Sequence, residues 1–322
     1  MKLSALILLF FAVALEVAAD NKPSLKIVHI GDSYSSGNGA SKIEGDGWYG
    51  PHWCFRNKFN WGQQAAHKAF GNDFSVAYTN IACSGGVIKD VKERRTLKDV
   101  LCSSGSRSPD HTIGKNKGSY FFRSDKCANT VAPQIDAVGD QTDLVFLTLG
   151  GNDAGFGDIA SKCFINRITF FGFTVAGGSK EDCESQSDLA LEFVAKDFSN
   201  DFRELLLDIT SRMAPDGKIV VVAYPNLALD KKKDRNINVN KIVAAASIKQ
   251  REVIDKVNNE LDKEMVLLYT GTSDSFAGKE AVTGRKMFFG PGPNEDGFFE
   301  EFTTERGLYV GSGGAPSLKM VR

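Results

Sequence analysis

The stretch Leu25-Lys26-Ile27-Val28-His29-Ile30-Gly31-Asp32-Ser33-Tyr34-Ser35-Ser36-Gly37 runs from an apolar segment into a turn of glycine and small polar residues. Its first part, Leu25–Ile30, predicts a buried strand. Ser33 then stands at the carboxyl end of that strand, which is the edge where ligands bind in open α/β sheets. A helix that begins just after Ser33 would direct free backbone N–H groups toward it. Ser33 is therefore a candidate nucleophile, although Gly-Asp-Ser is also typical of an ordinary turn.

Further strand-like runs alternate with helical segments along the chain, which favours a parallel sheet with right-handed crossovers. We therefore expect a three-layer α/β/α domain with about five parallel strands. The expected strands are Leu25–Ile30, Phe74–Tyr78, Leu144–Leu149, Lys218–Ala223 and Met265–Tyr269. The expected helices are Trp61–Phe70, Leu189–Met213 and Lys241–Lys263.

The first residues have the pattern of a secretory signal: Lys2, an apolar run over Leu3–Leu15 and small residues at Val17-Ala18-Ala19. We expect cleavage after Ala19 and a secreted, extracellular product without an integral membrane span; the alternative is a retained anchor. Residues 20–322 are then expected to form a single domain. Residues 300–322 diverge from it in composition.

Charge and cysteine content exclude some classes of protein. The 39 basic and 40 acidic residues nearly cancel, which argues against a nucleic-acid partner. Lys231-Lys232-Lys233 is then either a solvated loop or a small binding patch. The six cysteines have no metal-site spacing, so we expect no metal and three disulfides. Sequence neighbours suggest the pairs 54–83, 102–127 and 163–183, although other pairings are open.

Three short polar segments follow successive predicted strands, and in a parallel sheet they would meet at one edge. They are the Ser33 turn, Asn80–Gly86 and Gly150–Gly157. Ser33 and Gly85 can offer backbone N–H groups there, and Asn152 can offer its side-chain amide. Donors of this kind stabilise the negative charge that forms on an attacked carbonyl oxygen.

These segments resemble the SGNH (GDSL-type) esterases and lipases, in particular their secreted bacterial and fungal branch. Gly31–Gly37 resembles the first block of that family, and Cys54-Phe55-Arg56 with Ala82–Gly86 resembles the second. Asp143–Phe156 resembles the third, and Val222–Pro225 looks like the strand after it. The resemblance is strongest over residues 25–230. The Gly-x-Ser-x-Gly elbow of α/β-hydrolases does not occur.

The resemblance implies a flavodoxin-like SGNH fold, the three disulfide pairs, and cofactor-independent hydrolysis of a carboxylic ester. The ester would be a lipid or an acylated carbohydrate, and the oligomeric state stays open. In this reading Ser33 forms the acyl-enzyme, and Ser33, Gly85 and Asn152 form the oxyanion hole. Asp32 would fix the turn by hydrogen bonds, and Asp153 would cap the segment that follows it.

One part of the family pattern is not matched, because the family supplies a histidine as base near its C-terminus. This sequence has histidine only at positions 29, 52, 67 and 111. Thr303, in Glu301–Gly307, stands where the histidine is expected. We expect His29 in the core, His67 and His111 on the surface, and His52 either structural or catalytic. A frameshifted or truncated end and true loss of the base are both open.

Two functions follow from this pattern. The first is a secreted ester hydrolase whose activity is impaired by the missing base. The second is a secreted, non-catalytic protein of the same fold that binds an acyl or glycan ligand. A related alternative concerns Phe170–Phe173, an apolar patch that is either buried core or a lip for an acyl chain.

Overall fold

The computed structural model describes residues 22–40, 47–97, 100–101, 111–115, 126–164, 168–170, 173–228 and 234–276. Several predictions fall on other residues: the signal segment 1–19, the basic run 231–233, Thr303 and the tail 300–322. The side chains of His52, His111, Cys102, Cys127 and the Phe170–Phe173 patch also lie outside the description.

The centre of the fold is a five-stranded parallel sheet in the order β13-β12-β9-β1-β4. If the five strands are numbered in chain order, they lie side by side in the order 2-1-3-4-5, which is the arrangement of flavodoxin-like folds. The order in which the chain adds strands to the sheet reverses between β1 and β9. The prediction of an α/β fold with five parallel strands is confirmed. The strands are β1 Ser24–Gly31, β4 Ser75–Asn80, β9 Leu144–Thr148, β12 Lys218–Val222 and β13 Val266–Tyr269.

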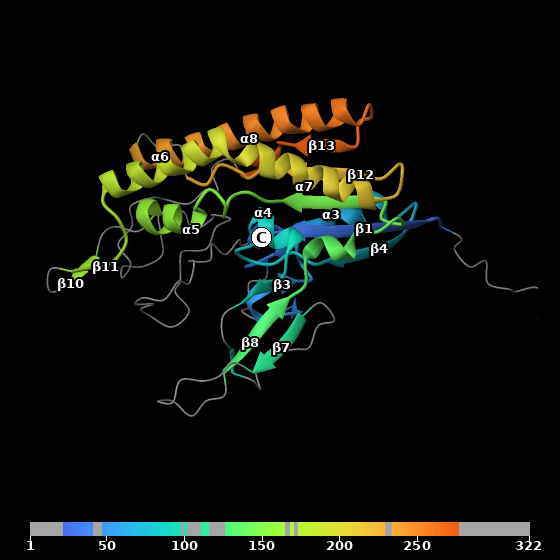
Figure 1. The fold of residues 1–322 in the computed structure, drawn as a ribbon, viewed down its shortest axis with the longest axis horizontal. Coiled ribbons are helices and arrows are strands. Elements are labelled where there is room, and N and C mark those ends of the chain that lie inside the picture. The colour runs from blue at the N-terminus through green and yellow to red at the C-terminus, as the bar shows by residue number, and fades with distance from the viewer. Residues whose placement is uncertain are drawn as a thin grey trace, which may run out of the picture.

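Successive side chains of β1 enter two different cores, as the alternation of a strand requires. Val28 and Ile30 pack in the larger core with residues of α4, α7 and α8, whereas Ile27 packs with Ala66 of α3 on the opposite face. These two layers of helices cover the sheet, with α7 and α8 on one side of it in Figure 1. Because both faces are covered, the strand is apolar along most of its length.

The helices and helical turns connect these strands. The helices are α2 Ser33–Ser36, α3 Trp61–Phe70, α4 Ile88–Lys92, α5 Phe156–Ile159, α6 Lys180–Lys196, α7 Phe198–Arg212, α8 Asp234–Glu260 and α9 Thr272–Phe276. The 3₁₀ turns are η1 His52–Cys54 and η2 Gln134–Ala137, and η3 Ala160–Phe164 is a π-helical turn.

The single helix expected over 189–213 is in fact two helices. The backbone N–H of Asp197 donates to Phe193 O and closes α6, and α7 begins at the next residue. The Phe198 ring then stacks on Phe202, with 4.9 Å between ring centroids. Since neither proline nor glycine stands at this junction, the sequence carries no signal for the break.

Smaller sheets lie outside the central one. They comprise β2 Trp48–Tyr49 with β3 Arg56–Asn57, β10 Ile168–Phe170 with β11 Phe173–Ala176, and β5 Arg95–Thr96 with β6 Val100–Leu101, β7 His111–Lys115 and β8 Lys126–Val131. Disulfides join Cys54 to Cys83 and Cys163 to Cys183, as the resemblance implies.

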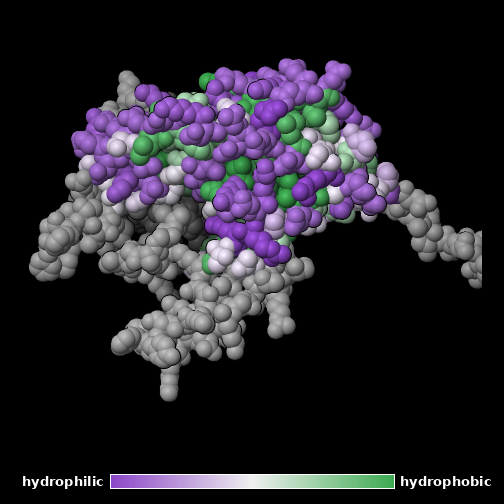
Figure 2. Space-filling model, in the orientation of Figure 1, coloured by the Kyte–Doolittle hydropathy of each residue, from purple (hydrophilic) through white to green (hydrophobic). Residues whose placement is uncertain are grey.

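The face of the described residues seen in Figure 2 is mostly hydrophilic, with hydrophobic residues scattered among polar ones. Within the described ranges, no helix combines the length and the apolar character that crossing a bilayer requires.

Candidate active site

The turn after β1 is fixed by its own side chains. Asp32 is the N-cap of α2, and its Oδ1 accepts a hydrogen bond from Tyr34 N at 2.9 Å. Gly37 ends this four-residue helix in the left-handed conformation, with φ of 83°. The prediction that Asp32 fixes the turn is therefore confirmed, and Ser33 stands as the first residue of α2.

Gly31 is required where β1 meets this turn. Its φ of 134° is one that residues with a side chain rarely adopt, and a Cβ atom would collide with Thr148 O of β9. Both of its backbone polar groups bond to the buried Gln134: Gly31 N donates to Oε1 at 2.7 Å, and Nε2 donates to Gly31 O at 3.0 Å. The end of β1 is thus held from the neighbouring strand and from η2.

A partly buried tyrosine, Tyr224, links the turn after β1 to the loops after β9 and β12. The Tyr224 hydroxyl donates to Asp32 Oδ2 and accepts from Gly151 N at 3.1 Å. The ring also meets the ring of Tyr34 edge to face, with centroids 5.9 Å apart. One hydroxyl therefore couples the cap of the Ser33 turn to the residue that precedes Asn152.

The loop after β9 is bonded to the loop after β4. Asn152 Nδ2 donates to Gly86 O at 2.9 Å, and an amide nitrogen has a second N–H that this bond leaves available. The carboxylate of Asp153 accepts from Ile88 N at 3.0 Å, so it caps the first turn of α4. The sequence reading placed that cap on the segment directly after Asp153, but α5 has no side-chain cap at its N-terminus.

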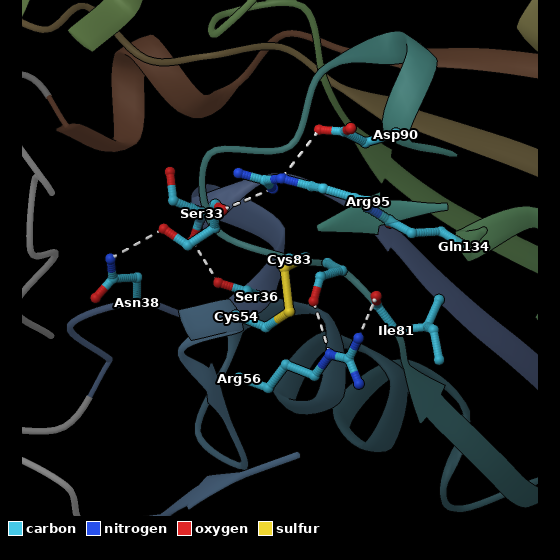
Figure 3. The surroundings of a disulfide bond; sticks show 12 residues. Ser33, Ser36, Asn38, Cys54, Arg56, Ile81, Cys83, Asp90, Arg95 and Gln134 are labelled. Carbon is cyan, nitrogen blue, oxygen red and sulfur yellow. Dashed lines mark hydrogen bonds and ion pairs between the residues drawn. A yellow bond between two sulfur atoms is a disulfide. The ribbon is translucent and has the colours of Figure 1, made fainter. Parts of the chain in front are cut away.

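The loop that holds Gly85 is fixed by a disulfide, by a backbone hydrogen bond to β1 and by the side chain of Arg95. Cys83, disulfide-bonded to Cys54, donates its backbone N–H to Gly31 O. Figure 3 shows Arg95 reaching along this loop toward Ser33; its Nη1 donates to Ser84 O at 3.0 Å, and its Nε lies 3.3 Å from Asp90 Oδ2. These contacts keep the Gly85 loop against the end of β1.

Ser33 and Asn152 line one pocket, which opens at the point where the strand order reverses between β1 and β9. Asp32, Ser33, Asn38 and Asn152 are polar lining residues, and apolar side chains, most of them from α5 to α8, form most of the rest. Gly85 is not among the lining residues, although its loop is bonded to Asn152 through the neighbouring Gly86. The structure thus brings two of the three predicted residues into the pocket and places the third in the adjoining loop.

Burial raises the pKa of the Asp32 carboxyl to about 7, against the opposing effect of its hydrogen bonds from Tyr224 and Tyr34. Burial likewise raises the pKa of Asp153 to about 6. The described residues contain no group of three potential metal ligands. The pocket offers a serine hydroxyl and amide donors beside a buried carboxyl group.

Comparisons with known proteins agree with this architecture. Lipase 2 of Streptomyces coelicolor is 29% identical over 218 residues, which is 66% of this chain and 57% of that protein. A lipase of Streptomyces rimosus is 24% identical over 218 residues, which is 68% of this chain and 59% of that protein. The chain thus spans less than two thirds of the length of these relatives. No model of a protein family matches the sequence.

Solved structures show the same fold. The phospholipase A1 of Streptomyces albidoflavus superposes with a TM-score of 0.56 over 92% of this chain and 93% of that one, at 19% identity. The extracellular lipase of Streptomyces rimosus superposes with a TM-score of 0.52 over 85% and 92%, at 20% identity. In sequence and fold the chain is thus similar to these lipases, in agreement with its resemblance to the SGNH (GDSL-type) hydrolases.

The described histidine side chains of this chain lie away from Ser33. His29 is fully buried on the face of β1 that packs against α3, and its ring meets Trp61 edge to face. His67 is exposed on α3. The predictions of a core His29 and a surface His67 are confirmed, and neither imidazole lines the Ser33 pocket.

Sequence reasoning missed three residues of the candidate site and its supports: Tyr224, Gln134 and Gln250. Tyr224 lies two residues after the end of β12, so the rule that strand ends share one edge could have pointed to it. Gln134 precedes β9 by ten residues in a 3₁₀ turn, and no local pattern signals its bonds to Gly31. Gln250 lines the same pocket from α8, where it interrupts an otherwise apolar stripe.

Proposed function

We propose that this chain is a secreted carboxylic ester hydrolase that forms an acyl-enzyme on Ser33. The observation that supports it most directly is the common pocket of Ser33 and Asn152 at the reversal point of a flavodoxin-like sheet. The lipase relatives point to the same reaction class. The N-terminal segment 1–19 supports export, and the substrate class is a lipid ester or an acylated carbohydrate.

In the first step the Ser33 Oγ would attack the ester carbonyl carbon, and the carbonyl oxygen would take up negative charge. The backbone N–H groups of Ser33 and Gly85 and the free N–H of Asn152 Nδ2 would receive that charge. The alcohol would leave with a proton, and water would then release the acid. Loss of one oxyanion donor typically raises the barrier by about 3 kcal/mol.

The hydroxyl proton of Ser33 needs an acceptor in this step. Among the described lining residues Asp32 has the only carboxyl group, and its two oxygens already accept from Tyr34 N and Tyr224. The sequence has no histidine after His111. We therefore propose that turnover by this chain is slow. The expected acceleration over the uncatalysed reaction is about 10³–10⁴-fold, which is what a serine hydrolase retains without its base.

The test is hydrolysis of p-nitrophenyl acetate together with labelling by a fluorophosphonate probe. We expect the unmodified chain to react and Ser33→Ala to lose both signals, with the exposed Ser211→Ala as the matched control. Equal signals from the unmodified chain and Ser33→Ala would exclude Ser33 as the nucleophile.

A second candidate function is a non-catalytic binding protein that retains the pocket, and the unmatched histidine favours it. The two are separated by Thr303→His, which restores the side chain expected at that position. A large gain in turnover with p-nitrophenyl acetate, from a chain otherwise without turnover, would favour the binding protein. Turnover by the unmodified chain that depends on Ser33 would favour the hydrolase.

A further inference from the structure

Gln250 is a buried amide that the fold does not use. Its side chain is only 2% exposed, yet it has no hydrogen bond to any residue that the structure describes. The neighbouring amides on α8 differ: Asn240 bonds to both the N–H and the C=O of Ala228, and Asn258 bonds to the backbone of Met265 and Val266. The amide atoms of Gln250 are not among the fully enclosed, unpartnered polar atoms of the described residues; they border the pocket, where a group on a ligand could bond to them.

The position of Gln250 on its helix places it in the pocket wall. Val239, Ile242, Val243, Ala246 and Gln250 follow at intervals of a helical stripe, and all of them line the pocket that Ser33 also lines. Beyond Gln250 the stripe continues with Val253 and Val257, which pack in the main core. Among the described residues of this stripe, Gln250 is thus the one amide, and it lines the pocket.

The other residues that line the pocket determine the polarity and charge of a ligand that can bind there. Leu149, Phe156, Phe198 and Leu227 from other elements face the same space, so the occupant is largely apolar. No lysine, arginine or glutamate is among the described lining residues, and the one carboxyl group, Asp32, adjoins Ser33. An ionic group on the ligand would therefore find no counter-charge beside Gln250.

We propose that this pocket binds the acyl part of a neutral ester whose chain carries a hydroxyl group, and that Gln250 recognises that hydroxyl. A primary amide offers both a donor and an acceptor, and a hydroxyl group uses both at once, whereas a methylene uses neither. This proposal rests on the proposed ester hydrolysis at Ser33, because that reaction places the ester group at Ser33 and directs the acyl chain toward Gln250. It makes Gln250 a residue that determines specificity rather than one that takes part in bond breaking.

The experiment measures binding without turnover, in the full chain with Ser33→Ala. Isothermal titration compares methyl octanoate with a set of methyl hydroxyoctanoates that carry the hydroxyl at each carbon from C3 to C8. One regioisomer should bind about tenfold more tightly than methyl octanoate, which is the gain from one satisfied buried hydrogen bond. In a purely apolar pocket every hydroxylated ester would bind more weakly, because the hydroxyl loses its water.

Two further variants in the Ser33→Ala background assign the preference to the residue. Gln250→Met keeps the length of the side chain without its polar atoms and should remove the tenfold preference, and its melting temperature should not fall. The matched control is Gln64→Met on the exposed surface of α3, which should keep the preference. If Gln250→Met does not fold, Gln250→Leu replaces it. The comparison of regioisomers in the Ser33→Ala chain, which keeps Gln250, still tests whether the pocket prefers a hydroxylated ester.

The outcomes separate this proposal from that of ester hydrolysis. Absence of any tighter regioisomer, absence of binding by all of the esters, or an unchanged preference in the variant would overturn the hydroxyl subsite. A Gln250-dependent preference in a chain that never turns over esters would leave the subsite standing and count against the hydrolase. Turnover that depends on Ser33, without a Gln250-dependent preference, would support the hydrolase and overturn the hydroxyl subsite.

Discussion

Tyr224 donates a hydrogen bond to the buried carboxylate of Asp32, although 192 residues separate them in the sequence. Asp32 directly precedes Ser33, and the same tyrosine hydroxyl accepts from Gly151 N, next to Asn152. The side chain therefore connects the loop of the candidate nucleophile to the loop of the candidate oxyanion donor. We regard Tyr224 as a positioning residue, since it acts through these two loops.

The first prediction concerns that hydroxyl. Tyr224→Phe removes the acceptor of Gly151 N and the donor to Asp32, and we expect the free energy of unfolding to fall by about 1–3 kcal/mol. The measurement is denaturant unfolding at pH 7, with the half-exposed Tyr269→Phe as control. An unfolding free energy equal to that of the control would show that the network contributes nothing to stability.

Gly31 provides the second prediction. Gly31→Ala places a methyl group against Thr148 O at a φ of 134°, so we expect a loss of about 3 kcal/mol or more in unfolding free energy. Gly139→Ala is the matched control, because nothing lies within 4 Å of its added Cβ atom. Thermal melting of the two variants compares them, and similar melting temperatures would contradict the steric argument.

His29 gives a prediction of pH dependence. Burial lowers the pKa of its imidazole to about 3, and its Nε2 has no partner among the described residues. Nδ1 lies 2.6 Å from the Tyr78 hydroxyl, which donates to Asn60 Oδ1, so Nδ1 carries the single proton of a neutral ring. Since the unfolded chain binds a proton below about pH 6.5, stability is lost as the pH falls through that range.

The measurement is the unfolding free energy of the unmodified chain and of His29→Leu between pH 6.5 and pH 4. The unmodified chain should lose about 3 kcal/mol relative to the variant over this range, at roughly 1.4 kcal/mol for each pH unit below the unfolded pKa. Parallel pH profiles would mean that the imidazole is charged or solvated in the folded protein.

Asp32 should have the opposite pH dependence. Its folded pKa, raised to about 7, lies above that of the unfolded chain, so stability is present at low pH and is lost as the pH rises from about 4 to 7. We expect a loss of about 4 kcal/mol relative to Asp32→Asn over that range, as an order of magnitude. Unfolding at a series of pH values in both proteins tests this, and a stability of the unmodified chain that rises with pH from 4 to 7, relative to Asp32→Asn, would contradict it.

Local sequence was sufficient for the elements that position the candidate site. Helix α3 has the predicted bounds, and each of the five expected strands is present within one or two residues. Buried strands and amphipathic helices have periods that a short window reveals. The break at Asp197 was not predictable in this way, because it depends on how Phe198 packs rather than on a turn residue.

By itself the sequence determined that Ser33 follows a buried strand and that three polar loops follow neighbouring strands, since hydrophobic period and glycine-rich turns are local properties. Only the tertiary structure decided which partners those loops find. Gln134 pairs with Gly31 across 103 residues, and Gln250 reaches the pocket from a helix that begins after β12. Contacts of this kind depend on how layers pack in three dimensions, and no periodicity along the chain encodes them.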